Sequence, residues 1–141
     1  MMAGIRGRNT KPEIIVRKAL FTSGFRFRLH RRDLPGKPDV VLTSRRVVVF
    51  VHGCFWHAHL GCRYAKTPST HREFWKAKLA ANVERDQRAR EALMSAGWRV
   101  LVVWECATRT FSAREQLPKL LSRWIEGSEL IGEFGSSSTQ P

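Results

Sequence analysis

Apolar side chains recur at helical spacing in three segments of the chain. The capping-box pattern T-x-x-E occurs twice ahead of such spacing and predicts helices over residues 10–23 and 70–96. We expect the second of these helices to break near Asn82. Residues 116–125 have an amphipathic pattern that predicts a third helix.

Four other segments have apolar patterns typical of strands. Residues 25–29 alternate apolar side chains with arginine, which predicts a half-buried strand with a basic outer face. Residues 40–42 and 47–51 are continuous apolar runs, as in buried central strands, and residues 98–104 are similar. The order helix, three strands, helix, strand, helix predicts an α/β fold with a small mixed sheet flanked by helices.

The length of the chain is consistent with one folded domain. Its 141 residues are 43% hydrophobic, so the chain can bury a core, and we place the domain at residues 1–125. Residues 126–141 hold three acids and no base and end in a serine-rich run, which predicts a disordered tail without function. No apolar run is long enough for a membrane span or a signal peptide, so we expect a cytoplasmic protein.

The chain is strongly basic. Its 25 Lys and Arg residues against 12 Asp and Glu residues give a formal net charge of +13. Residues 1–32 hold nine of these bases, including Arg6 and Arg8, and a single acid, Glu13. Because a basic folded domain attracts polyanions, we expect nucleic acid as the partner.

The three cysteines suggest a metal site. Cys54 and Cys62 enclose His59 in the pattern C-x4-H-x2-C, and Cys106 follows the last predicted strand. Three thiolates and one imidazole suit a closed tetrahedral Zn²⁺ site. Spacing alone allows His57 as the fourth ligand instead, and three buried, reduced cysteines are the alternative to a metal.

Two acids are candidates for a second, catalytic metal. Asp39 stands at the start of an apolar strand, where a carboxylate can hold Mg²⁺, although an aspartate there can also satisfy the amides of a turn. Glu13 could contribute to the water shell of that metal, or could only cap its helix and pair with Arg17.

Histidines and aromatic side chains surround the cysteine-rich loop. His57 could move a proton and His52 could contact a phosphate, although both could equally be structural. Phe55, Trp56 and Trp75 lie among cations, a pattern that favours insertion between base pairs over the usual place of aromatic residues in the core.

Taken in chain order, these motifs resemble the very short patch repair (Vsr) endonucleases over residues 10–124. The matching segments are Thr10-Lys11-Pro12-Glu13, Leu34-Pro35-Gly36-Lys37-Pro38-Asp39, His52-Gly53-Cys54-Phe55-Trp56-His57, Glu73-Phe74-Trp75, Asn82-Val83-Glu84-Arg85-Asp86 and Gly97-Trp98-Arg99-Val100-Leu101-Val102-Val103-Trp104-Glu105-Cys106. The resemblance implies a restriction-endonuclease-like core of the order α-β-β-β-α-β-α. It also implies an Mg²⁺-dependent enzyme that nicks 5′ of the thymine in T:G mismatches, which arise by deamination of 5-methylcytosine.

The resemblance also implies roles for the candidate residues. Asp39 and the backbone carbonyl of Val51 would bind Mg²⁺, Glu13 would hold metal-bound water, His57 would be the catalytic histidine and His52 an auxiliary. The structural zinc set would be Cys54, His59, Cys62 and Cys106. The residues that insert at the mismatch would be Phe55, Trp56 and Trp75.

The sequence departs from the family pattern at a few positions. Val51 stands where the best-known member has threonine, and the spacing between His59 and Cys62 is one residue longer. The second acid and the lysine of ordinary restriction-enzyme sites are missing at residues 50–52.

The expected function is therefore initiation of mismatch repair. The substrate would be double-stranded DNA with a T:G mismatch, the protein would act as a monomer at the bacterial nucleoid, and its partners would include mismatch-repair proteins and a cytosine-5 methyltransferase pathway. Two alternatives stay open: a non-catalytic zinc module that binds distorted DNA, and a nuclease that cuts intact or branched DNA.

Overall fold

The computed structural model describes residues 10–135. Arg6 and Arg8 of the basic N-terminal segment, and residues 136–141 of the predicted tail, lie outside the described residues. Three helices and five strands make up the described part, together with the short 3₁₀ turns η1 (Thr43–Arg45) and η2 (Glu105–Thr108). They are α1 (Lys11–Thr22), β1 (Arg28–Leu29), β2 (Val40–Leu42), β3 (Val47–His52), α2 (Arg72–Ser95), β4 (Arg99–Trp104), α3 (Phe111–Glu126) and β5 (Ile131–Phe134).

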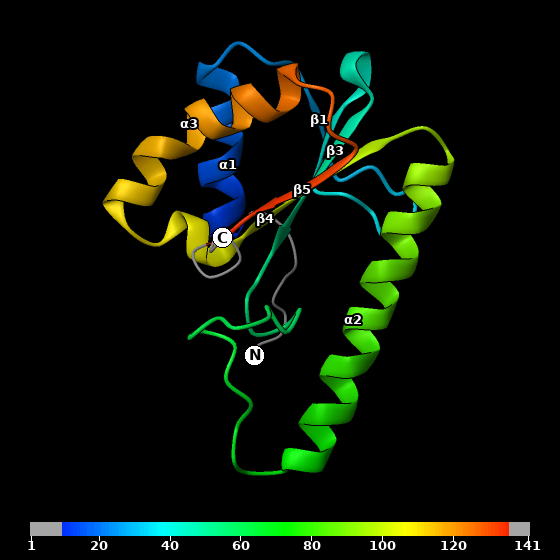
Figure 1. Ribbon diagram of the computed structural model, residues 1–141, viewed down its shortest axis with the longest axis vertical. Helices are drawn as coiled ribbons and strands as arrows, with labels where there is room; N and C mark the ends of the chain where they lie inside the picture. Colours follow the sequence, from blue (N-terminus) through cyan, green and yellow to red (C-terminus); the bar gives the residue numbers. More distant parts are fainter. Residues whose placement is uncertain (1–9, 136–141) are drawn as a thin grey trace.

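The five strands form one mixed sheet in the spatial order β1-β2-β3-β4-β5. β1, β2 and β3 pair antiparallel, whereas β3, β4 and β5 pair parallel. The two parallel pairs need crossover connections, and α2 and α3 supply them (Figure 1). This arrangement confirms the predicted small mixed α/β sheet.

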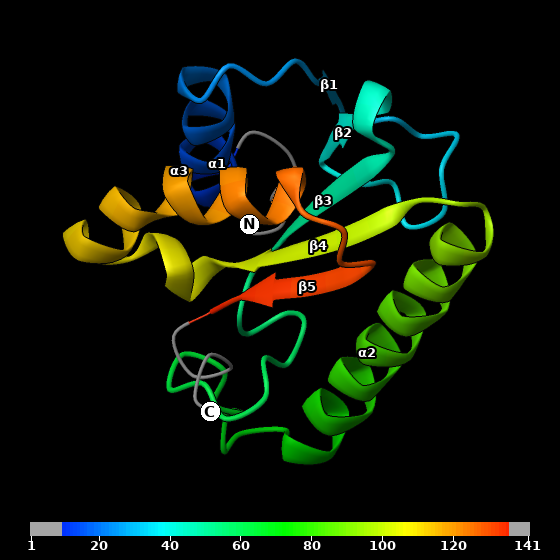
Figure 2. The ribbon, with the colours of Figure 1, turned by 45° about the horizontal axis from the view of Figure 1, so that its top comes forward.

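Helices cover both faces of the sheet, as Figures 1 and 2 show. α1 and α3 lie together on one face, where Leu20 and Leu121 are buried against Val49 and Leu101. α2 lies on the other face, where Leu93 is buried with Val48 and Val100. Successive strand residues point to opposite faces, so both central strands are buried on both sides, as their continuous apolar runs predicted.

The helices differ from the predicted ones at three points. α2 begins at Arg72 with His71 as its N-cap and no side-chain cap, so the second T-x-x-E pattern lies one residue too early to act as a capping box. α2 is continuous through Asn82, because the Asn82 side chain is buried and donates a 2.9 Å hydrogen bond to the Trp56 carbonyl instead of competing for its own helix backbone. α3 begins at Phe111, five residues before the predicted start, because the Thr110 hydroxyl caps it by accepting from the Ala113 amide.

The expected disordered tail is the main correction to the predicted fold. Residues 131–134 form β5, which pairs with β4 from Val100 to Val103. Gly132 permits this pairing, since a Cβ atom at that position would overlap the Trp124 indole nitrogen. The polar composition of the segment hid an edge strand that uses only half of its side chains for packing.

No helix within residues 10–135 has the length and apolar character required to cross a lipid bilayer.

Candidate active site and metal centre

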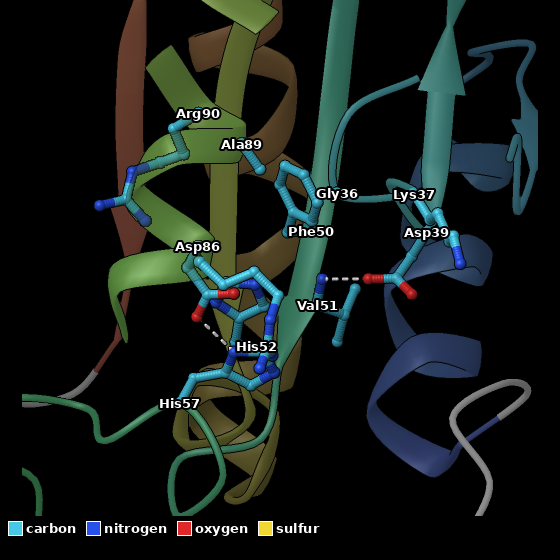
Figure 3. Close-up of a pocket in the computed structure, with 11 residues that line it drawn as sticks. Gly36, Lys37, Asp39, Phe50, Val51, His52, His57, Asp86, Ala89 and Arg90 are labelled. Atoms are coloured by element: carbon cyan, nitrogen blue, oxygen red, sulfur yellow. Dashed lines mark hydrogen bonds and ion pairs between the residues drawn. The ribbon is translucent and has the colours of Figure 1, made fainter. Parts of the chain in front are cut away.

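A cavity of about 270 Å³ lies between the ends of β2 and β3 and the middle of α2 (Figure 3). Asp39 immediately precedes β2, Val51 and His52 end β3, and Asp86 and Arg90 reach the cavity from α2. Segments far apart in the sequence thus bring two acids, two histidines and three basic side chains to one cavity.

Gly36 brings the loop before β2 close to α2. Its φ of +74° favours glycine, and a Cβ atom there would lie 2.7 Å from the Ala89 Cβ. The loop that carries Asp39 therefore lies directly against the helix that carries Asp86.

Asp39 is the most perturbed acid of the cavity. Its Oδ2 accepts a 2.7 Å hydrogen bond from the Val51 amide (Figure 3). Burial raises the pKa of Asp39 to about 7, the Val51 hydrogen bond opposes this rise, and the negative charge of Glu13 adds to it. A carboxylate that is costly to ionise in the empty protein is a group that a bound cation would stabilise.

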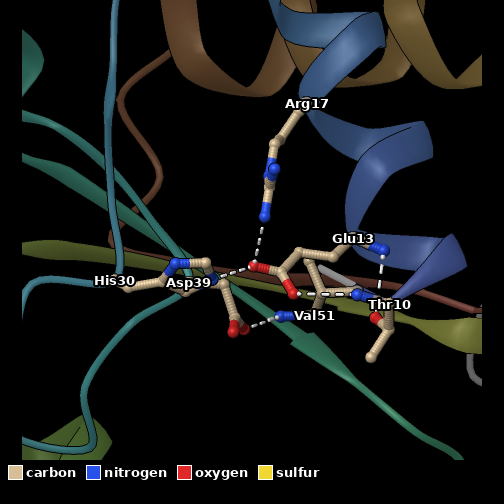
Figure 4. Close-up of polar contacts among 6 residues, drawn as sticks. All are labelled: Thr10, Glu13, Arg17, His30, Asp39 and Val51. Carbon is tan, nitrogen blue, oxygen red and sulfur yellow. Dashed lines mark hydrogen bonds and ion pairs between the residues drawn. The ribbon is translucent and has the colours of Figure 1, made fainter. Parts of the chain in front are cut away.

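Glu13, His30 and Asp39 form a compact group beside the cavity (Figure 4). One ligand atom from each lies within 4.8 Å of the others. Buried Glu13 accepts from Arg17 at 3.0 Å and from the His30 imidazole, and it completes the predicted capping box with Thr10. The alternatives for Glu13 therefore coexist: it caps α1, pairs with Arg17 and lies close to Asp39.

His57 lies in the cavity and is oriented by Asp86. The His57 Nδ1 is 2.6 Å from Asp86 Oδ2, and the ring stacks on His52 with centroids 3.7 Å apart. Burial lowers the pKa of His52 well below its ordinary value, with a further contribution from the nearby His57. The pair His57–Asp86 has the geometry of a proton-transfer imidazole held by a carboxylate.

The four residues Cys54, His59, Cys62 and Cys106 form a second group, the Cys/His cluster. All four are buried, and one ligand atom from each lies within 4.8 Å of the others. The His59 Nδ1 is 3.7 Å from the Cys54 Sγ and 3.5 Å from the Cys106 Sγ. The sequence left His57 and His59 as alternatives, and the structure brings His59 to the thiols and His57 to Asp86.

The donor set of the Cys/His cluster fits a structural Zn²⁺ ion. Burial raises the pKa of the Cys54 thiol, so in the absence of a cation the thiolate is disfavoured. Three sulfurs and one imidazole nitrogen that converge on one buried point are the tetrahedral set that zinc prefers.

Four aromatic rings form a partly exposed cluster on the loop that carries His57 and on the first turn of α2: Phe55, Trp56, Phe74 and Trp75. Trp56 is 47% exposed and Phe74 is 60% exposed. The Phe55, Trp56 and Trp75 rings contact one another edge to face, with centroids 5.0 to 5.8 Å apart. The three aromatics singled out in the sequence are therefore neighbours, and Phe74 joins them.

Comparison with known proteins decides the family. A family model described as DNA mismatch endonuclease Vsr matches residues 1–64. The type II nicking enzyme V.XorIIP of Xanthomonas oryzae pv. oryzae is 52% identical over 115 residues, covering 82% of this chain and 84% of that protein. The DNA mismatch endonuclease Vsr of Escherichia coli is 44% identical over 128 residues, covering 89% of this chain and 81% of that protein. The chain belongs to the Vsr family.

As a Vsr-family protein the chain is a DNA endonuclease, and the resemblance seen in its motifs is confirmed. A further relative, the type II nicking enzyme V.NmeAIP of Neisseria meningitidis, is 42% identical over 122 residues, or 86% of each chain. Several relatives are thus described as nicking enzymes, which supports DNA nicking by this Vsr protein as well.

Sequence reasoning missed two residues of this Vsr site. His30 and Asp86 contact Glu13 and His57 across 17 and 29 positions, so local spacing could not pair them. A weak signal existed for Asp86, since it lies one helical turn after buried Asn82 on the same side of α2.

Proposed function

We propose that the chain is an Mg²⁺-dependent nickase that cuts 5′ of the thymine in T:G mismatches and so initiates very short patch repair. The observation that carries this proposal is one cavity that holds both Asp39 and the His57–Asp86 pair, next to an exposed aromatic cluster. An acid for a metal, an imidazole for a proton and rings for a distorted base stack are the three parts that such a reaction needs.

Asp39 is the residue that would hold Mg²⁺, with the Val51 carbonyl as a second ligand and Glu13 accepting from the water shell. When bound, Mg²⁺ would polarise the scissile phosphate and promote ionisation of a water. Arg17 and His30 hold the Glu13 carboxylate, so its position toward Asp39 is set before any metal binds.

His57 would move the proton of the hydrolysis. The hydrogen bond from Nδ1–H to Asp86 leaves Nε2 as the reacting nitrogen and stabilises the imidazolium when it forms. His52 supports the ring of His57 by stacking, and its lowered pKa keeps it neutral there.

The Cys/His cluster would hold a structural Zn²⁺ ion that ties the loop after β3 to the turn after β4. That loop carries His57 and the rings of Phe55 and Trp56, so the metal would fix both the proton-transfer group and the base-stack contacts. We expect about one zinc per chain and unfolding by strong chelators.

The aromatic cluster would recognise the mismatch. Exposed rings can insert into a base stack that is already weakened at a mispair, and the cost of unstacking is least there. Surrounding lysine and arginine side chains would contact the phosphates without reading sequence.

The wider setting follows from this activity. The element order supports a restriction-endonuclease-like core, and the protein would work as a monomer at the nucleoid on DNA left by a cytosine-5 methyltransferase. Mismatch-repair proteins would be its further partners.

A nicking assay tests the function. Purified protein with Mg²⁺ should cut one strand of a T:G duplex, and Asp39→Asn and His57→Ala proteins should bind the same duplex without cutting it. Binding without cleavage by the wild type in Mg²⁺ and in Mn²⁺ would instead indicate a non-catalytic DNA-binding module. Equal cutting of paired or branched DNA would indicate a nuclease with another substrate.

A further inference from the structure

A second cavity, of about 730 Å³, adjoins the first, because Asp86 and Arg90 line both of them. His59 and Leu60 of the cysteine-rich loop, Trp104 at the end of β4 and Glu133 of β5 line it. None of the roles proposed above uses Glu133, the acid that the sequence placed in a functionless tail.

His59, which lines this cavity, has one ring nitrogen without a hydrogen-bond partner among the described residues. Its Nδ1 faces the sulfurs of Cys54 and Cys106, whereas its Nε2 is buried and makes no hydrogen bond within residues 10–135. The residue is only 3% exposed, so this nitrogen cannot rely on bulk water. A buried imidazole N–H without an acceptor is destabilising, so this nitrogen calls for a partner.

Glu133 is linked to His59 through Trp104. The Trp104 ring stacks on the His59 ring, with centroids 4.0 Å apart and planes 8° from parallel. The Trp104 Nε1–H donates a 2.6 Å hydrogen bond to Glu133 Oε1. The ring that covers His59 thus holds Glu133 at the cavity that both residues line, and that hydrogen bond uses only one of the two carboxylate oxygens.

A general feature of zinc sites agrees with this placement. Imidazoles that bind zinc commonly donate their other ring N–H to a carboxylate, which fixes the tautomer and makes the ligating nitrogen more basic.

We propose that Glu133 is the positioning residue of the metal centre: its Oε2 accepts the hydrogen bond from His59 Nε2–H when the Cys/His cluster holds zinc. The last strand of the chain thereby becomes part of the metal site, through Trp104 and Glu133, although it supplies no ligand. The inference rests on the proposed zinc occupancy and is independent of the proposed mismatch substrate.

Zinc affinity measured by competition with a chromophoric chelator tests this inference. We expect Glu133→Ala to weaken zinc binding by roughly 10- to 100-fold, the loss typical of an outer carboxylate partner. Glu133→Gln keeps the size of the side chain but has one acceptor oxygen for two donors, Trp104 Nε1–H and His59 Nε2–H, so it should also weaken zinc binding. Glu129→Ala removes an exposed acid that lies just before β5 and does not line the cavity, and should bind zinc as the wild type does.

A spectroscopic readout separates hydrogen bonding from general damage to the fold. In zinc-loaded wild type the His59 Nε2–H proton should give a slowly exchanging NMR signal, which Glu133→Ala and Glu133→Gln should both lose and Glu129→Ala should retain. Trp104→Phe keeps a ring over His59 but frees Glu133, and should show an intermediate loss of zinc affinity.

The possible failures are distinguishable. Wild-type affinity and an unchanged Nε2–H signal in Glu133→Ala would overturn the inference while leaving the zinc site intact. A wild-type protein that binds no zinc would overturn the zinc site and this inference together, and would leave the nicking proposal to its own assay.

Discussion

The acid and the imidazole of the catalytic cavity are prepared in different ways. Asp39 is partly buried with one backbone donor, so its ionised form is unstable until a cation arrives. His57 instead has a carboxylate partner, with Asp86 Oδ2 2.6 Å from its Nδ1. The candidate site thus combines an acid suited to a bound cation with an imidazole that a second acid orients.

Asp39→Asn should remove the pH dependence of stability that the burial of the Asp39 carboxyl causes. In the folded, metal-free protein the pKa of Asp39 is about 7, whereas in the unfolded chain the same carboxyl has its ordinary pKa of 3.8. Between these values the folded state binds the extra proton, so wild-type stability falls as pH rises. Relative to Asp39→Asn, the wild-type free energy of unfolding should drop by about 2 to 3 kcal/mol between pH 5 and pH 8.

Urea denaturation of both proteins without Mg²⁺, with the zinc content held equal, measures this difference. If the free energies of unfolding of the two proteins change in parallel across that pH range, burial does not disfavour the ionised form of Asp39.

Asp86→Asn should lower the rate of nicking more than it lowers DNA binding. Without the carboxylate the His57 imidazolium loses its partner, and general acid–base catalysis of this kind contributes about 10²- to 10⁴-fold in rate. Single-turnover kinetics should therefore show a loss of at least about 10-fold. Glu84→Gln, which removes an exposed acid from the same helix, is the matched control and should cut normally.

At the scale of elements, the pattern of apolar and polar residues was enough to predict the central strands and the first helix. The apolar runs of β2, β3 and β4 and the capping box of α1 needed no distant information, because strand burial and helix capping are local signals. β5 could not be predicted this way, since its stability comes from pairing with β4 and from the space that Gly132 leaves for Trp124. Spacing likewise could not choose between His57 and His59 as the candidate metal ligand, because only the folded loop brings His59 to the three thiols.

Gly132→Ala should destabilise the end of the sheet. The added Cβ would overlap the Trp124 indole nitrogen, so β5 or the end of α3 must shift, and overpacking of this kind costs about 1–3 kcal/mol. Ile131→Ala, on the same strand at a half-exposed position, should cost less. Thermal denaturation of the two variants compares them, and a smaller loss in Gly132→Ala would contradict the packing described for β5.

At the scale of the whole molecule, two kinds of surface divide the work of DNA recognition. A net charge of +13 favours any duplex and depends on salt, because bound phosphates release counterions. The aromatic cluster, with Trp56 and Phe74 exposed, would instead contact the base stack. Affinity for any duplex should therefore depend on the basic side chains and on salt, whereas the preference for mismatched DNA should depend on the aromatic rings.

Trp56→Ala should reduce the preference for mismatched DNA without changing the dependence on salt. The 47% exposed ring is lost, at a cost of about 1–3 kcal/mol on the mismatched duplex, while the phosphate contacts stay. Titrations of T:G and C:G duplexes at several salt concentrations measure both quantities. An unchanged preference, or a shallower salt slope, would show that Trp56 does not contact the base stack.

The most direct test of the account is the cutting of two duplexes that differ only at one base pair. With Mg²⁺ present, the wild-type protein should nick the T:G duplex on the thymine strand, immediately 5′ of the mismatched thymine, and leave the C:G duplex intact. Asp39→Asn should cut neither. Equal cutting of both duplexes, or wild-type cutting by Asp39→Asn, would contradict the account.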